Sequence, residues 1–406
     1  MVAIRNDALL DSRASKATFQ YLNRYAECDT PDPYLLENLG SHDFALVIPA
    51  YKEDFDFVEG LAKRPDAEQI LLLLVLNEPE TDRCNSQNAR FMQTLRNRAN
   101  SQAEGAHFAI HVLGKLTILS IDHTGTRALP AKQGVGRARK IGADLACHLF
   151  TLNKIRQPWI FSSDADARLS SDHFVAPKDT NASAYYYPFR HFGGDAALRE
   201  ATQTYERCLY YYTTQLSRAG SPYAFHTLGS AMAISISHYC HARGFPKRAG
   251  GEDFYLFNKL AKLAPIHYAI GCEVAIRSRA SDRVPFGTGP AVIRIMEQHA
   301  AGQEPCYYSP RIFDELKLLL QHVSQSWRCS ETLQNQLSAA AWQALQDAGF
   351  SQFLAKRKQQ DKNETQFMKH FHQWFDAFQT LKFIHRLQSS YPDVPVKAIH
   401  EDLIYN

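Results

Sequence analysis

Short runs of hydrophobic residues alternate with stretches of helical spacing along the first part of the chain. Residues 44–48 and 69–76 are continuous apolar runs, a pattern typical of strands buried on both faces of a parallel sheet. Further strand candidates lie at 107–121 and 159–161, and helical spacing is found at 86–103 and 134–150. This alternation predicts βαβ crossovers and an α/β fold.

The pattern changes toward the C-terminus. Strand candidates at 185–188, 231–236 and 274–276 are still separated by helices, but beyond about residue 290 the apolar residues recur only at helical spacing. The apolar residues of 312–327 lie on one face of a helix, and the apolar pattern of 367–387 predicts a single long amphipathic helix. We therefore predict a helical lead-in at 1–40, an α/β domain with a mostly parallel sheet at 41–290, and an all-helical C-terminal region at 291–406.

Composition is that of a soluble globular protein, with 45% hydrophobic and 21% charged residues. The formal charge of +3 gives no reason to expect a nucleic-acid partner. No stretch approaches the roughly 18 apolar residues of a membrane helix, and the N-terminus lacks the apolar segment of a signal peptide. The eight cysteines are scattered without a Cys-x-x-Cys pair, which predicts reduced thiols and a cytoplasmic protein.

Two carboxylates follow the apolar run at 159–161. Asp164 and Asp166 stand on alternate residues, and side chains at i and i+2 of a strand point to the same side. The carboxyl end of a strand is where open α/β sheets bind ligands. The pair therefore predicts a site for Mg²⁺ or Mn²⁺, which take carboxylate oxygens and leave positions for substrate phosphates. A second Asp-x-Asp triplet, Asp54 to Asp56, has no strand before it and is not expected to bind metal.

An aromatic side chain and another carboxylate follow the first strand. The chain continues there through Pro49, Ala50 and Tyr51 to Glu53. Tyr51 could pack beside a nucleobase, and Glu53 could accept a hydrogen bond from a base or a ribose. The alternative is an ordinary turn from strand to helix, in which Glu53 favours the N-terminus of the next helix.

Glycines and basic residues open the helix at 134–150. Lys132, Gly134 and Arg137 stand where backbone N–H groups suit an anion and where glycine lets a ligand approach. The basic residues could face a diphosphate, or they could form a solvated face of the helix. The spacing matches neither the Walker loop nor the Rossmann glycine fingerprint.

A third acidic segment precedes an amphipathic helix. Gly250 and Gly251 lead into Glu252 and Asp253. A carboxylate at such a turn could deprotonate an acceptor hydroxyl, an effect worth roughly 10²–10⁴-fold in rate. The alternative is a pair of acids that only complement the helix dipole.

Taken in order, these segments resemble family-2 glycosyltransferases of the nucleotide-sugar-binding GT-A fold, over about residues 43 to 290. The matching segments are Val47 to Glu53, Gly134 to Gly142, Ser163 to Asp166, Gly229-Ser230 with Gly244-Phe245, and Gly251 to Asp253. Each motif is short, and their joint order and spacing make the match. The C-terminal helices lie outside it.

The resemblance implies a donor site at the start of the domain. The nucleotide base and ribose would contact Pro49, Ala50, Tyr51 and Glu53, and the base or diphosphate would lie near Lys132, Gly134 and Arg137.

It also implies a metal and a base. Asp166 would hold Mg²⁺ or Mn²⁺, and Asp164 would touch the ribose or a metal-bound water. The metal would neutralise the leaving diphosphate. Asp253 would be the catalytic base, with Glu252 helping to place the acceptor or the donor sugar.

The chain departs from the family pattern in two places. The second strand ends at Asn77 where relatives often carry an Asp that helps to hold the base. The zone in which many relatives place a further metal-binding His carries arginines instead, among them Arg279 and Arg283. These could bind the diphosphate or an anionic acceptor, since guanidinium suits phosphate and carboxylate, or they could form a structural salt-bridge cluster.

The acceptor region implied by the resemblance contains Gly229 and Ser230. His226 just before it could reach an acceptor, although a lone His beside aromatic residues is more often a packing residue.

These expectations combine into a cytoplasmic, metal-dependent glycosyltransferase that moves a sugar from a nucleotide-diphospho-sugar donor to an unidentified acceptor hydroxyl. The leading interpretation is inversion with Asp253 as base, and the alternative is a retaining enzyme that acts on a small anionic acceptor such as glycerate or phosphoglycerate. A sugar-phosphate nucleotidyltransferase would need a glycine-rich loop after the first strand, which is missing. A non-catalytic nucleotide-sugar-binding scaffold stays open. The C-terminal helices could cap the acceptor site, form a homo-oligomer or bind a partner.

Overall fold

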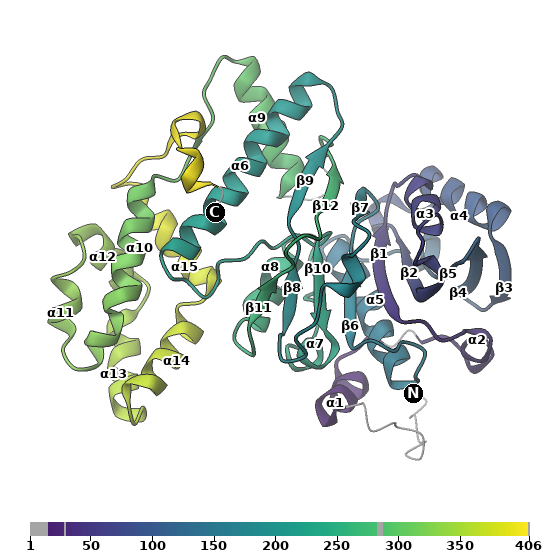
Figure 1. Ribbon diagram of the computed structural model, residues 1–406, viewed down its shortest axis with the longest axis horizontal. Helices are drawn as coiled ribbons and strands as arrows, with labels where there is room; N and C mark the ends of the chain where they lie inside the picture. The colour runs from purple at the N-terminus through teal and green to yellow at the C-terminus, as the bar shows by residue number, and fades with distance from the viewer. Residues whose placement is uncertain (1–14, 28–29, 282–286, 405–406) are drawn as a thin grey trace. The chain divides into compact units, whose positions relative to one another are not determined.

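The computed structural model describes residues 15–27, 30–281 and 287–404, which form two compact units (Figure 1). The first unit contains the chain up to Gly193 together with Thr227–Arg277. The second contains Gly194–His226, Ser278–Ser281 and the chain from Thr288 onward. The domain boundary at residue 290 stays a prediction. The two units are not continuous in sequence, since Gly194–His226 belongs to the second unit.

A nine-stranded mixed sheet forms the centre of the first unit among the described residues, in the order β11-β8-β10-β6-β1-β2-β5-β4-β3. Strands β6, β1, β2 and β5 run parallel to one another, while β10 and β4 are antiparallel to the strands that flank them. The strands are β1 (Phe44–Ala50), β2 (Ile70–Asn77), β3 (Asn100–Glu104), β4 (Phe108–Leu113), β5 (Leu116–His123), β6 (Trp159–Ser162), β8 (Ala184–Tyr186), β10 (Met232–Ser235) and β11 (Ile266–Tyr268). The predicted α/β class with a parallel central sheet is confirmed.

Every residue of β1 and β2 is buried, which explains why these two strands are continuous apolar runs. Pro49 lies within β1 although proline cannot donate to a strand ladder. The pairing of β1 with β6 stops at Val47. Pro49 therefore has no residue of β6 opposite it, and its lack of an N–H group leaves no β6 carbonyl oxygen without a donor.

Helices connect the parallel strands, as predicted. The helices of this unit are α1 (Lys16–Arg24), α2 (Pro33–Asn38), α3 (Asp56–Ala62), α4 (Ser86–Arg98), α5 (Gly134–Thr151), α7 (Ile236–His241) and α8 (Glu252–Leu260). A small second sheet has the order β7-β12-β9, with strands Ala167–Leu169, Val274–Arg277 and Phe189–Phe192. Short 3₁₀ turns occur at Ala67–Gln69, Glu80–Asp82, Gly125–Arg127 and His173–Val175.

The predicted helix at 86–103 is too long. Helix α4 ends at Arg98, and residues 100–104 form the edge strand β3. The polar sequence of β3 is exposed except at Ala103, so it carries no strand-like hydrophobic pattern that the sequence could reveal.

The second unit is built from helices that pack around an aromatic core, with buried residues such as Tyr211, Phe350, Phe367 and Phe371. The helices are α6 (Ala196–Arg218), α9 (Thr288–Ala300), α10 (Pro310–His322), α11 (Ser330–Gln334), α12 (Ala339–Asp347), α13 (Phe350–Gln360), α14 (Glu364–Trp374) and α15 (Ala377–Leu387). Its 3₁₀ turns are Val323–Trp327, Val396–Ala398 and Glu401–Leu403.

Two expectations for this region are wrong in detail. The single helix predicted at 367–387 is two helices, because Asp376 caps the N-terminus of α15 by accepting from the N–H groups of Phe378 and Gln379. The region is also not entirely helical, since β13 (Cys306–Tyr307) and β14 (Val394–Pro395) form a two-stranded sheet. In the part of the chain that the structure describes, no helix is both long and apolar enough to cross a membrane.

Helix α5 packs against β1, β2 and β6 at very short range. A Cβ atom on Gly142 would lie 2.5 Å from Cγ1 of Val47 and 3.2 Å from Cγ2 of Val75. This glycine therefore lets the helix approach the centre of the sheet more closely than any other residue would allow.

We expect Gly142→Ala to lower the free energy of unfolding by about 1–2 kcal/mol. The added methyl group overpacks the interface between helix and sheet, and this cost exceeds the stabilisation that alanine gives through its higher helix propensity. Urea unfolding measures the change. Val47→Ala in the same chain should restore part of the loss. Gly60→Ala in α3 is the matched control, since its Cβ would meet nothing within 4 Å, and it should be neutral or slightly stabilising. Equal effects of the two alanines would contradict the close-packing explanation.

Candidate functional site

The centre of the sheet contains a topological switch point. From β1 the chain proceeds to β2 and β5 on one side, and then α5 leads back to β6 on the other side of β1. Ligands of open α/β sheets bind outside the carboxyl ends of the strands at such a point. The segments that follow β1 and β6 there contain Tyr51 and the pair Asp164 and Asp166.

A buried arginine on α5 links this point to the acidic start of α8. Only 3% of Arg139 is exposed. Its Nη2 atom lies 2.5 Å from Oδ1 of Asp164, and its Nε donates to Oε1 of Glu252 over 2.8 Å. The remaining guanidinium nitrogen, Nη1, donates to Oγ of Ser162 and to the carbonyl oxygen of Ser163. Burial alone would lower the pKa of Arg139, but Asp164 and Glu252 reverse that effect and raise it, so the group stays charged.

The two aspartates after β6 lie in a turn rather than in a strand, which corrects the prediction that alternation along a strand brings them together. Strand β6 ends at Ser162, and the N–H of Ala167 donates to the carbonyl oxygen of Asp164 across the turn. Both side chains are half-buried. The N–H of Arg277, at the end of β12, donates to the carbonyl oxygen of Asp166 and anchors that end of the turn.

Asp253 lies in the first turn of α8, after Gly251 in the left-handed conformation at φ 69°. Its Oδ2 accepts from the N–H of Gly229 over 2.9 Å, and its Oδ1 accepts from the N–H of Phe254 over 2.7 Å. Burial raises the pKa of Asp253 to about 7, and the neighbouring Glu252 carboxylate adds to the rise. A carboxylate with a pKa near 7 suits general-base chemistry at neutral pH.

Gly229 and Ser230 join the end of β6 to Asp253 through their backbone. Oγ of Ser162 donates to the carbonyl oxygen of Gly229, and Oγ of Ser163 donates to that of Ser230. Ser230 is 4% exposed. The predicted acceptor role of these two residues is untested, and the contacts that the structure gives them hold the acidic segments together.

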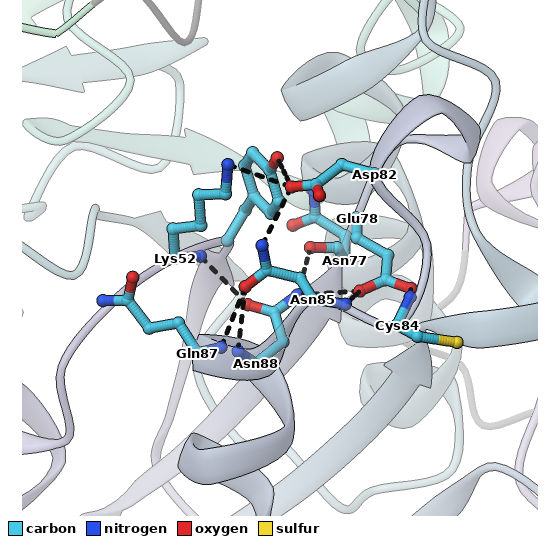
Figure 2. A network of polar contacts seen from close by, with 9 residues as sticks. Lys52, Asn77, Glu78, Asp82, Cys84, Asn85, Gln87 and Asn88 are labelled. Atoms are coloured by element: carbon cyan, nitrogen blue, oxygen red, sulfur yellow. Dashed lines mark hydrogen bonds and ion pairs between the residues drawn. The ribbon is translucent and has the colours of Figure 1, made fainter.

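A second polar network lies after the carboxyl ends of β1 and β2 (Figure 2). Asp82 accepts from the hydroxyl of Tyr51 over 2.5 Å and pairs with Nζ of Lys52 over 2.9 Å. Lys52 has a positive φ of 56°, and its N–H donates to Oδ1 of Asn88. Burial and the Asp82 carboxylate both raise the pKa of Tyr51.

Glu78 organises the loops behind this network. Its side chain is fully buried and accepts from the N–H groups of Cys84 and Gly125 over 2.7 Å each, and from the N–H of Asn85 over 3.2 Å. Neighbouring Asn77 is 6% exposed, and its Oδ1 has no hydrogen-bond partner among the described residues.

The other residues predicted to bind the donor differ in accessibility. Pro49 and Ala50 are buried within β1, Glu53 is half-buried, and Lys132 is exposed. Gly134 and Gly136 make room for the protein's own backbone, since a Cβ on Gly136 would lie 2.6 Å from the carbonyl oxygen of Arg248 and the N–H of Gly136 donates to that oxygen.

Arg137 has a partner other than the predicted diphosphate. Its Nε lies 3.3 Å from Oε2 of Glu27, and Lys247 pairs with the same carboxylate over 2.9 Å. Because Arg137 and Arg139 are two residues apart on α5, their side chains lie about 200° apart around the helix. Arg139 therefore faces the acidic groups, and Arg137 faces Glu27.

Three predicted residues are not among the described residues of the first unit. His226 and Arg279 belong to the second unit, and Arg283 lies outside the described residues. His226 is 7% exposed and packs edge-on against Tyr210, and burial lowers its pKa to about 4, so the ring is neutral at neutral pH. This environment agrees with a packing role.

The donor set fits one mode of metal binding. No cluster of three or more His, Cys, Asp or Glu side chains that could hold a metal occurs in the described part of the chain. Mg²⁺ bound together with substrate phosphates needs only one or two protein carboxylates, and Asp164 and Asp166 can supply them.

Sequence reasoning missed three residues of these networks. Arg139, Glu78 and Asp82 were not singled out, although each is a charged residue in or next to a segment that was. A charged residue on the otherwise apolar face of α5 is the signal that could have identified Arg139, because burial of such a group demands partners.

Comparisons with known proteins add little. No family model and no curated protein matches the chain. Among solved structures it is similar to the crystal structure of GalNAc-T7 with UDP, GalNAc and Mn²⁺, with 13% identity and a TM-score of 0.35 over 93% of this chain and 63% of that one. It is also similar to a crystal structure of a mycobacterial protein, with 12% identity and a TM-score of 0.31 over 69% of this chain and 84% of that one. The chain thus spans less than two thirds of the first structure, and at these TM-scores neither likeness supports a conclusion about this protein.

We expect Asp253→Asn to change how stability depends on pH. The folded protein keeps the Asp253 proton up to about pH 7, whereas the unfolded chain releases it near pH 4. Ionisation of this group therefore lowers the stability of the wild type as the pH rises from about 4 to 7. Urea unfolding at several pH values should show the wild type losing stability relative to the Asn variant across this window and a constant difference above it. A constant difference at every pH would contradict the raised pKa.

Proposed function

We propose that this protein is a glycosyltransferase of the GT-A type, which moves a sugar from a nucleotide-diphospho-sugar donor to an acceptor hydroxyl. One observation carries the proposal. Carboxylates from separate segments, Asp164 after β6 and Glu252 at the start of α8, pair with a single buried guanidinium at the switch point of the sheet, and Asp253 directly follows Glu252. The order of motifs that resembles family-2 glycosyltransferases supports the same assignment.

On this proposal the donor lies at the carboxyl ends of β1, β2 and β6. The network of Tyr51, Lys52 and Asp82 would border the nucleotide, and the unpaired Oδ1 of Asn77 would accept from a base or ribose donor group. Asp166, with Asp164, would hold Mg²⁺ or Mn²⁺. The metal would supply positive charge to the leaving diphosphate.

Asp253 is the candidate base. In an inverting transfer the acceptor oxygen forms a bond to the anomeric carbon, the bond from that carbon to the diphosphate breaks, and the hydroxyl proton passes to the Asp253 carboxylate. The two backbone N–H groups that hold this carboxylate would keep it aimed while the acceptor approaches. With a pKa of about 7, roughly half of the Asp253 side chains are deprotonated at pH 7 and can take the proton.

Removal of the metal-binding carboxylate tests the donor site. We expect Asp166→Ala to weaken Mn²⁺-dependent binding of UDP or GDP at least tenfold, as measured by calorimetry, because it removes a direct ligand. Asp54→Ala is the matched control from the other Asp-x-Asp triplet, and it should bind like the wild type. Unchanged binding by Asp166→Ala would exclude this residue from a metal site.

Removal of the base tests the chemistry. A thermal-shift screen of nucleotide sugars with Mn²⁺ identifies the donor, and Asp253→Asn should then bind it normally but transfer the sugar about 10²–10⁴-fold more slowly. Normal transfer by this variant would refute the base assignment. The anomeric configuration of the product, read by NMR, distinguishes inversion from retention, and binding without transfer by the wild type would indicate a non-catalytic scaffold.

A further inference from the structure

Arg139 donates to two segments that are distant from it in sequence. Its guanidinium donates to Ser162 and Ser163 at the end of β6, to Asp164 in the following turn, and to Glu252 in α8. Asp164 is 25 residues away along the chain and Glu252 is 113. Each of the three guanidinium nitrogens has at least one acceptor, which a buried guanidinium requires.

The loop at Gly229 is shaped around the same side chain. A Cβ on Gly229 would clash with Nη2 of Arg139, so any larger residue there would displace the guanidinium. The N–H of Gly229 in turn donates to Asp253, and its carbonyl oxygen accepts from Ser162. The guanidinium thus touches the neighbours of Asp253 from two directions, through Glu252 and through Gly229.

We propose that Arg139 is a positioning residue that orients both the Asp164 carboxylate for the donor and, through Glu252 and Gly229, the Asp253 carboxylate for the acceptor. This inference rests on the proposed function for what the two carboxylates do. Without the guanidinium, the Asp164 and Glu252 carboxylates would lose the cation that pairs with both of them, and their mutual repulsion would favour separation of the two segments.

The shape of the guanidinium matters as well as its charge. Its planar fork presents donors in several directions at once, whereas the ammonium of a lysine is a single point on a flexible stem. A lysine at this position can reach Asp164 or Glu252 but cannot hold both of them together with the two serines.

Two variants separate positioning from stability. Arg139→Lys keeps the charge and loses the fork. The double variant Arg139→Met with Glu252→Leu replaces the buried ion pair by apolar side chains of similar size, a change that proteins often tolerate without loss of stability. Arg156→Met is the control, because Arg156 forms an exposed ion pair with Asp43 in the same unit.

Binding of UDP and GDP in the presence of Mn²⁺ is measured by calorimetry, and stability by urea unfolding. We expect the double variant to remain folded and to bind the nucleotide at least tenfold more weakly, the lysine variant to lie between it and the wild type, and the control to be unchanged. A folded double variant with wild-type affinity would overturn the proposal.

Hydrogen exchange tests the same idea without a nucleotide. The N–H of Gly229 donates to the Asp253 carboxylate, and that of Ala167 donates to the backbone carbonyl oxygen of Asp164 across the turn. Both amides should therefore exchange at least tenfold faster in the double variant, while amides of β1 and β2 stay protected. Unchanged exchange at both amides would refute positioning by Arg139. If the wild type binds neither nucleotide, the proposed function fails, and the exchange result still decides whether Arg139 holds the two segments.

Discussion

The candidate site depends on the burial of one guanidinium. Transfer of a charged group into a protein interior is costly unless opposite charges and hydrogen-bond acceptors surround it. Arg139 meets that requirement only when the end of β6, the turn at Asp164 and the start of α8 are all in place. If any of these segments were displaced, the buried guanidinium would lose an acceptor, and that arrangement of the first unit would be unstable.

The close packing of α5 on the sheet determines where that guanidinium lies. Gly142 lets the helix approach Val47, and Gly136 lets it approach the backbone of Arg248, just before the acidic start of α8. The glycines that open α5 therefore act through protein packing. A helix held further from the sheet would carry Arg139 away from Ser162 and Asp164, so the glycines of α5 determine how close the arginine of the same helix comes to the end of β6.

The two polar networks are held in different ways. Around Glu78 the donors are mostly backbone N–H groups, which belong to the loops that follow the carboxyl ends of β2 and β5. Around Arg139 the donor is a charged side chain, and its acceptors are two carboxylates, one hydroxyl and one backbone carbonyl oxygen. The positive φ of Lys52 lies beside the first network, where Asn88 and Asp82 hold the residue in a conformation that costs about 1 kcal/mol or more. Fixed loops and fixed charges at the ends of neighbouring strands are what a site for a nucleotide diphosphate needs.

Local patterns made the parallel strands and the connecting helices predictable, since fully buried runs and helical spacing are properties of single segments. The exposed strand β3 and the break at Asp376 escaped prediction because each depends on pairing or capping that hydrophobic periodicity does not record. The acids at 164 and 253 stand out in the sequence, but the guanidinium that links the segments that carry them does not. The buried ion pair of Arg139 and Glu252 joins residues 113 positions apart, and a contact at that separation produces no periodic pattern in the sequence.

Two arginines within one turn of α5 also show why the sequence does not predict which residues meet. Arg137 and Arg139 are equally basic and stand in the same segment, so composition assigns either of them to an anion. The helical repeat separates them by about 200°, and the orientation of α5 on the sheet then sends Arg137 to Glu27 and Arg139 to Asp164. That orientation is set by the packing of Gly142 against Val47, a contact between residues that carry no chemistry of their own. The chemical role of a charged residue in this protein is therefore decided by the apolar contacts of the element that carries it.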